Sequence, residues 1–240
     1  MKEKPILFSA PMIRAILGGR KTQTRRIAKL ADDGHVRLAH RRWHPDDPNA
    51  ALACPYGQPG DRLWVRETWG YRMSSRSYNS LGPGKHGDDV HVIQYKADGA
   101  LMDFPLPHGS SDPKGLPRQR QRKKGEDGYD YADYLTAYWK AWRPSIFLPR
   151  WASRIALEIA SARLERLKEI SEEDAIAEGC IPTSGWAPSY RDPDSGFGPD
   201  PISAKDEYAD LWESINGPGS WPLNPRVWVV EFRKLEGGEA

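Results

Sequence analysis

The segments with the alternating pattern of β-strands do not alternate regularly with the segments that have helical spacing. The expected strands are instead separated by turns or by long loops. Strands are expected at 4–8, 63–67, 90–95, 154–167 and 227–232, and helices at 10–17, 130–142, 171–178 and 204–215. This order predicts an α+β fold with a mixed or antiparallel sheet, of which a small β-barrel is one form, rather than a doubly wound α/β fold.

The length of 240 residues predicts one domain, or one domain with an insertion. The 21 prolines and 22 glycines predict a large share of exposed loop, whereas ten tryptophans argue against wholesale disorder. Residues 28–59 are polar with weak strand signals only. Residues 98–127 are expected to form a mobile excursion, and 183–201 a second loop rich in proline and glycine.

The charge and the cysteines exclude several classes of protein. A formal net charge of +2 is too small for a general polycation, so a nucleic-acid site has to be a local patch such as 20–26 or 118–124. Cys54 and Cys180 form no C-x-x-C pair and the six histidines lack ligand spacing, so neither a metal nor another cofactor is predicted. The chain has no long apolar run and no secretory signal at residue 1, which predicts a cytoplasmic protein without a membrane partner.

The segment Gly19-Arg20-Lys21-Thr22-Gln23-Thr24-Arg25-Arg26 combines four cations with two hydroxyl residues directly after an apolar helix pattern. It can therefore bind anions, and it contains an amine whose pKa the surrounding residues can shift. If the segment is extended, Thr22 and Thr24 share one face and Lys21 lies opposite. If it turns, Lys21 and Thr24 converge.

Four segments in order carry a resemblance to a known family. They are 5–27 with Gly-Arg-Lys-Thr-x-Thr-x-Arg, 60–69 with Gly-Asp-x-Leu-x-Val, 154–179 with Ser-Glu-Glu-Asp-Ala-Ile-Ala-Glu-Gly, and 208–235 with Val-Val-Glu-Phe. Together they resemble the ASCH domain. The runs Trp64–Trp69 and Pro149–Ile155 are similar to those of the longer phage and prophage members.

The resemblance implies a single domain over 1–240 with a PUA-like fold, in which short helices flank a small β-barrel and insertions lie at about 28–59, 70–145 and 180–203. It also implies a cleft where the Gly-Arg-Lys-Thr loop meets the Ala-Glu-Gly helix end. Small bacterial members hydrolyse N4-acetylcytidine with a Lys, a Thr and a Glu, which match Lys21, Thr24 and Glu178. Other members are ribonucleases or RNA binders.

Two mechanisms fit these three residues. Thr24 is the nucleophile if Lys21 takes its proton, which requires a lowered lysine pKa. Alternatively, Glu178 activates water directly and Thr24 positions it. RNA or a modified nucleoside is the expected partner, and the residues expected to hold it are Arg20, Arg25, Arg26, Trp64, Arg66, Glu67 and Trp69.

Simpler interpretations stay open beside these. Glu67 is also suited to be a buried partner of an arginine, and Trp64 and Trp69 to pack in a core. The cations suit phosphate binding without catalysis, and the run 118–124 suits a solvated segment. A non-catalytic nucleic-acid reader and a phage interaction scaffold are therefore alternative functions to the hydrolase.

Overall fold

The computed structural model describes residues 1–75, 89–104, 142–182 and 202–236. The chain divides into two compact units. The first unit comprises 1–6, 15–64 and 155–240, and the second comprises 7–14 and 65–154. The expected helix at 130–142 (except Trp142), the basic run 118–124 and the loop 183–201 lie outside the described residues.

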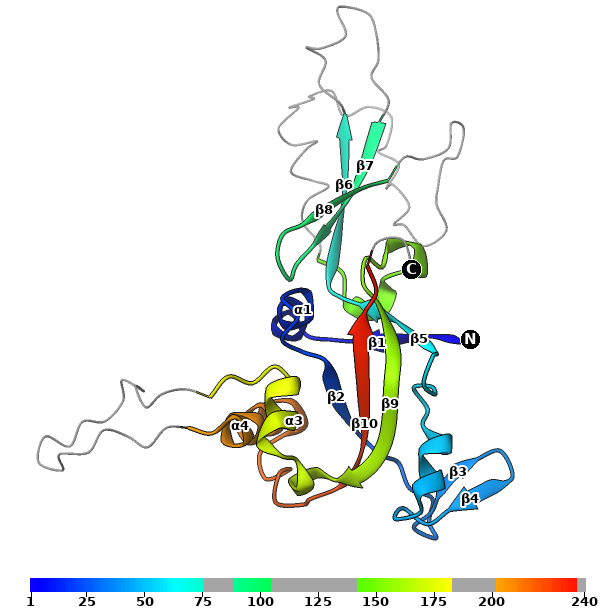
Figure 1. Ribbon diagram of the computed structural model, residues 1–240. Coiled ribbons are helices and arrows are strands. Elements are labelled where there is room, and N and C mark those ends of the chain that lie inside the picture. The colour runs from blue at the N-terminus through cyan, green and yellow to red at the C-terminus, as the bar shows by residue number, and fades with distance from the viewer. Residues whose placement is uncertain (76–88, 105–141, 183–201, 237–240) are drawn as a thin grey trace, which may run out of the picture. The chain divides into compact units, whose positions relative to one another are not determined.

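A five-stranded sheet in the order β1-β5-β9-β10-β2 contributes most of its residues to the first unit. Its strands are β1 (Glu3–Leu7), β2 (Gln23–Ile27), β5 (Arg62–Arg66), β9 (Ala156–Arg166) and β10 (Arg226–Lys234). Strands β9, β10 and β2 lie side by side in Figure 1, and both of their pairings are antiparallel. The register of β9 with β10 shifts between Glu231 and Phe232, which explains why the sequence of β9 alternates in two separate stretches.

Two capped helices cover part of this sheet. They are α3 (Glu172–Ala177) and α4 (Ala204–Asn216), and η4 (Leu167–Glu169) precedes α3. The Ser171 hydroxyl accepts from the Asp174 N–H, and the Ser203 hydroxyl caps α4 in the same way. Their apolar residues form a core cluster with two residues of β10, namely Leu167, Ile170, Ala175, Cys180, Ala204, Tyr208, Trp212, Val227 and Val229.

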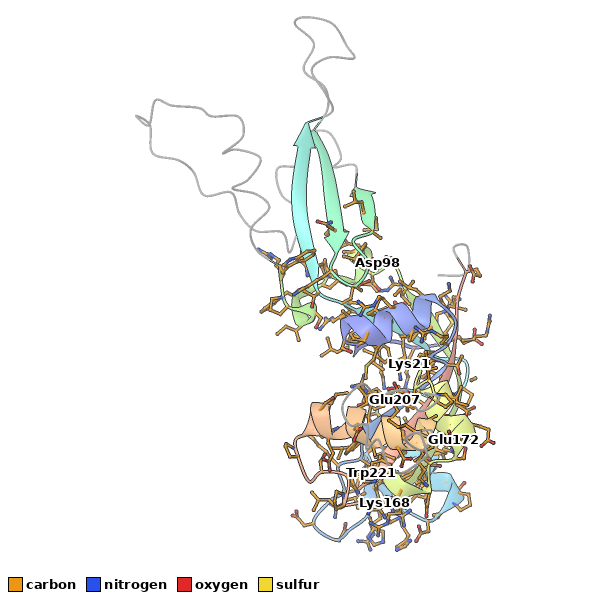
Figure 2. The ribbon with its side chains drawn as sticks, turned by 90° about the vertical axis from the view of Figure 1, so that its left-hand side faces the viewer. Lys21, Asp98, Lys168, Glu172, Glu207 and Trp221 are labelled. Atoms are coloured by element: carbon orange, nitrogen blue, oxygen red, sulfur yellow. The ribbon has the colours of Figure 1, made fainter. Side chains whose placement is uncertain are left out.

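Two carboxylates labelled in Figure 2 join the segment around α3 to α4. Glu172 accepts hydrogen bonds from the backbone N–H groups of Ala204 and Lys205, at 2.5 and 3.2 Å. Glu207 accepts from the N–H of Ile181 at 2.5 Å. These bonds satisfy backbone donors near the start of α4 and after α3, so they hold the two helices beside each other.

Residues 28–59 contain regular structure that the sequence pattern did not predict. Strands β3 (Val36–Leu38) and β4 (Arg41–Trp43) form a two-stranded hairpin, and η1 (Pro48–Ala53) follows it. Ala39 in the hairpin turn has a φ of 53°, in the left-handed region that favours glycine.

The second unit contains a three-stranded antiparallel sheet, β6 (Trp69–Ser75), β7 (Asp89–Tyr95) and β8 (Leu101–Phe104). The short helices η2 (Ser145–Phe147) and η3 (Arg150–Ala152) also belong to it. Its described core consists of Trp69, Ile93, Tyr95, Leu148 and Ala152. The Tyr95 hydroxyl donates to the carbonyl of Ala152 at 2.7 Å, which satisfies a buried polar group.

The structure confirms a mixed α+β fold with short helices. The expected helix at 10–17 is α1 (Ala10–Leu17), and the expected strands and the helices near 171 and 204 are present with small shifts of their ends. Among the described strands, β1 and β2 lie at opposite edges of the sheet order, so the closed barrel stays a prediction. None of the described helices is both long and apolar enough to cross a membrane.

Candidate functional site

The backbone around Gly19 turns the chain so that Lys21 lies against the end of α3. Gly19 has a φ of +71°, and the N–H groups of Arg20 and Lys21 both donate to the carbonyl of Ala15, at 2.9 and 3.1 Å. Such bonds satisfy the last carbonyls of a helix, here α1. The next N–H, of Thr22, donates to the carbonyl of Ala177 at 2.8 Å. The end of α1 and the end of α3 thereby hold Lys21 from both sides.

Lys21 and Glu178 form a buried ion pair in the first unit. Nζ of Lys21 lies 2.6 Å from Oε2 of Glu178 and also donates to the Glu178 backbone carbonyl at 2.9 Å. Lys21 is 2% exposed and Glu178 is 4% exposed. Both charges are therefore removed from bulk water and interact strongly.

The second carboxylate oxygen of Glu178 has a different environment. Oε1 lies 3.5 Å from Nη1 of Arg25, which is an ion pair without a hydrogen bond. Among the described residues, none donates a hydrogen bond to this buried oxygen. A buried acceptor in this state has capacity for one more donor.

Arg25 connects Glu178 to further carboxylates. Its Nη2 lies 2.7 Å from both Glu165 and Asp174, which are two further partners of one guanidinium. Arg163 also bonds Glu165 and Asp174, at 3.0 and 2.9 Å, and pairs with Glu231 of β10. We call Lys21, Arg25, Arg163, Glu165, Asp174, Glu178 and Glu231 the charge network.

Burial and neighbouring charge set the protonation of this network. Burial lowers the pKa of Lys21; Glu178 opposes this shift, and the positive charge of Arg26 adds to it. Burial alone would lower the pKa of Arg25, but Glu178 and its other acidic partners more than reverse that effect and raise it. Burial would raise the pKa of Asp174, and its bonds to Arg25 and Arg163 lower it instead.

The other expected residues of 19–26 have different positions. Thr24 is buried on β2 opposite Val230, and strand alternation puts it on the other face of β2 from Arg25. Arg26 is half-buried opposite Trp228, and Arg20 is exposed. The structure therefore brings Lys21, Arg25 and Glu178 into direct contact, with Arg26 close enough to influence the Lys21 pKa. Thr24 shares their strand, but strand alternation does not direct it toward Glu178.

Trp64 is buried in the first unit, whereas Arg66, Glu67 and Trp69 belong to the second. Glu67 accepts two hydrogen bonds from Arg154, at 2.8 and 2.9 Å, so its alternative interpretation as the buried partner of an arginine is confirmed. Trp69 is fully buried, as the alternative interpretation as a core residue predicts. The guanidinium carbon of Arg143 lies 5.5 Å from the centre of the Trp69 ring. The structure therefore assigns Glu67 and Trp69 to the interior of the second unit.

Arg163, Glu165 and Asp174 belong to the charge network but are not among the site residues that the sequence predicts. The alternation of β9 does contain a signal, because Arg163 and Glu165 put charge at successive positions of one strand face. A charged face on a central strand indicates a buried network or a covered site.

Comparisons with protein-family models, with curated proteins and with solved structures give no match for this chain. Within the described ranges, no three histidine, cysteine, aspartate or glutamate residues are grouped so that they could hold a metal ion. The candidate site is therefore the buried lysine–carboxylate pair with its arginines.

Proposed function

We propose that the protein binds RNA or a modified nucleoside at the charge network and hydrolyses the N4-acyl group of an acylated cytosine nucleoside such as N4-acetylcytidine. The proposal includes membership of the ASCH family and its PUA-like barrel. The observation that carries it is the buried contact of Lys21 with Glu178, whose Oε1 accepts no hydrogen bond from a described residue.

Stability alone gives little reason for such a pair. Moving two charges out of water costs several kcal/mol per ion, and apolar residues of the same volume often stabilise a fold at least as well. Strongly perturbed lysines are also concentrated at functional sites. The lowered pKa of Lys21, together with two arginines close by, therefore supports a chemical role.

An N4-acylated cytosine has the groups that this pair can bind. Its amide N–H is a donor for Oε1 of Glu178, and its acyl oxygen is an acceptor for the Lys21 ammonium. Arg26, which is half-buried beside this pair, suits a phosphate or a carbonyl. Because Lys21 and Glu178 are almost completely covered, a ligand reaches them only when neighbouring side chains move.

The mechanism in which Glu178 activates water fits this geometry better than a Thr24 nucleophile. Glu178 takes a proton from water while the water oxygen bonds to the acyl carbon, and the Lys21 ammonium stabilises the resulting oxyanion. The C–N bond then breaks, and the proton on Glu178 passes to the leaving N4. The products are the free carboxylic acid and the unmodified cytosine nucleoside. In this mechanism Thr24 only positions the water.

The test is direct. The protein is incubated with N4-acetylcytidine, and the formation of cytidine is followed by liquid chromatography. We expect turnover by the wild type, its loss in Glu178→Gln, and its retention in Glu173→Gln, which changes an exposed carboxylate of α3, the helix that Glu178 caps. Circular dichroism checks that each variant is folded. Wild-type protein that leaves N4-acetylcytidine unchanged rules out the hydrolase, and binding without conversion indicates a non-catalytic reader instead.

A further inference from the structure

The first unit has a hollow of about 330 Å³ beside the β3–β4 hairpin. The residues that line it are Arg41, Arg42 and Trp43 of β4, with Asn49 and Leu52 of η1. Two guanidinium groups, an indole ring, a side-chain amide and an aliphatic side chain therefore meet at one surface. The hairpin is visible near β9 and β10 in Figure 1. None of these five residues belongs to the charge network.

The walls of the hollow are fixed to the rest of the first unit. Trp43 is directly opposite Val36, which is buried. Asp46, shortly after β4, pairs with Arg226 at the start of β10. Asp47 caps η1 by accepting from the N–H and the side-chain amide of Asn49, at 2.8 and 3.0 Å. The hollow is therefore formed by folded elements, and its shape does not depend on a loop alone.

The residues that line the hollow carry two positive charges, those of Arg41 and Arg42, and no negative charge. Residues 34–45 contain three arginines and no acid. Asp33 is shared by Arg37 at 2.6 Å and Arg42 at 3.5 Å. No ion pair joins Arg41 to any residue in the described ranges, and Arg41 and Arg42 are both exposed. An anionic ligand is the natural partner for these two guanidinium groups.

We propose that this hollow is a second contact site for single-stranded nucleic acid, with a base against Trp43 and Leu52 and the neighbouring phosphates on Arg41 and Arg42. Single strands are held by such a combination of aromatic platform and basic groove, because every unpaired base has a face that can stack. Duplexes keep their bases stacked internally and offer the indole no such face. The site goes beyond the proposed hydrolysis and does not depend on it.

The test uses fluorescence anisotropy with a short labelled single-stranded RNA, the same sequence as single-stranded DNA, and the corresponding RNA duplex, over a series of salt concentrations. Trp43→Leu is expected to weaken binding of the single strands about five- to 150-fold. Trp43→Phe keeps an aromatic face and is expected to retain most of the affinity, which separates lost stacking from lost folding. Comparison of the single-stranded RNA with the single-stranded DNA shows whether the site distinguishes ribose from deoxyribose.

The arginines are tested against a matched control on the same hairpin. The double variant Arg41→Gln with Arg42→Gln is expected to reduce the salt slope by about 0.7 for each lost phosphate contact. Arg37→Gln changes the same charge on the adjacent strand, where Arg37 pairs with Asp33 and does not line the hollow, and should have a smaller effect.

Three results would overturn the proposal. The first is an equal loss of affinity for single strands in Arg37→Gln and in either Arg41→Gln or Arg42→Gln tested singly, and the second is unchanged affinity in Trp43→Leu. The third is that the protein prefers the duplex, or an acidic peptide added as a competitor, to the single strands. Turnover of free N4-acetylcytidine is measured on the same proteins. Hairpin variants that keep turnover but lose strand binding support the second site. A wild type without turnover refutes the hydrolase and leaves the binding result standing.

Discussion

Nζ of Lys21 lies 2.6 Å from Oε2 of Glu178, although 157 positions separate the two residues in the sequence. The segment after α1 and the end of α3 have to be in place together for this contact to form. The pair is buried, and its carboxylate also faces Arg25. Its removal therefore changes both the fold and the chemistry of the site.

Glu178→Gln keeps the size of the side chain and removes its charge, so it leaves Lys21 and Arg25 with less buried counter-charge. We expect the free energy of unfolding to fall by about 3–5 kcal/mol, the cost of breaking a buried pair from one side. Urea denaturation measures this fall. The exposed control Glu173→Gln should stay within about 0.5 kcal/mol of the wild type. In a Lys21→Met background the same change at Glu178 should cost less; fully additive losses would contradict the pairing.

Gly179 lies close to Ala15 and Lys21 in the backbone that follows α3. It has a φ of +98°, and a Cβ there would lie 3.2 Å from Cβ of Ala15 and 3.4 Å from Cβ of Lys21. Gly60 also has a positive φ, +86°, but a Cβ there meets no atom within 4 Å. We expect Gly60→Ala to cost about 1–2 kcal/mol from backbone strain. Gly179→Ala should cost a further 1–3 kcal/mol or so from crowding. Thermal denaturation compares the two, and equal costs would refute the close approach.

Asp174 links the charge network to acid stability. Its folded pKa is lowered below 3.8, because Arg25 and Arg163 outweigh the opposing effect of burial. A carboxyl with a lowered folded pKa contributes stability that is fully present above its unfolded value. This contribution is lost as the pH falls through the folded value. We therefore expect the urea midpoint of the wild type to fall below pH 3.8 more steeply than that of Asp174→Asn. Asp210→Asn changes an exposed acid of α4, so its urea midpoint should fall with pH as steeply as that of the wild type. If the urea midpoint of Asp174→Asn falls as steeply as that of the wild type, Asp174 does not have this role.

Trp69 distinguishes core packing from base stacking. Because the ring is fully buried against the core of the second unit, Trp69→Ala should lower stability by about 3–5 kcal/mol. The affinity of the folded protein for single-stranded RNA should be unchanged, in contrast to Trp43→Leu. Parallel melting and anisotropy measurements decide between the two roles. Lost RNA affinity at unchanged stability would return Trp69 to the binding site.

Local signals predicted much of the fold. The spacing of apolar residues in 10–17 predicts α1, and a helix is also expected at the position of α3, because such short helices depend on neighbours within a turn or two. The hairpin β3–β4 was missed because each strand has three residues and arginines hold three of those six positions. Such strands form when a partner and η1 cover their apolar residues, which no local pattern shows.

The site was predictable only in part for a similar reason. The match of Lys21 with Glu178 came from the order of motifs in a family resemblance, not from spacing. The partners of Arg25, Glu165 and Asp174, lie 140 and 149 positions away. The registers of β2 with β10 and of β10 with β9 align Arg25, Val229 and Arg163, and this alignment brings residues that are distant in the sequence together.

The pairing of β2 with β10 also has a consequence for synthesis on the ribosome. β2 is an edge strand whose partner is β10, and the register joins Ile27 to Val227, about 200 residues later. At roughly 5–20 residues per second, β2 emerges about 10–40 s before its partner. During this interval the nascent chain carries an unpaired strand with two adjacent arginines. These arginines oppose association with other strands until β10 completes the sheet.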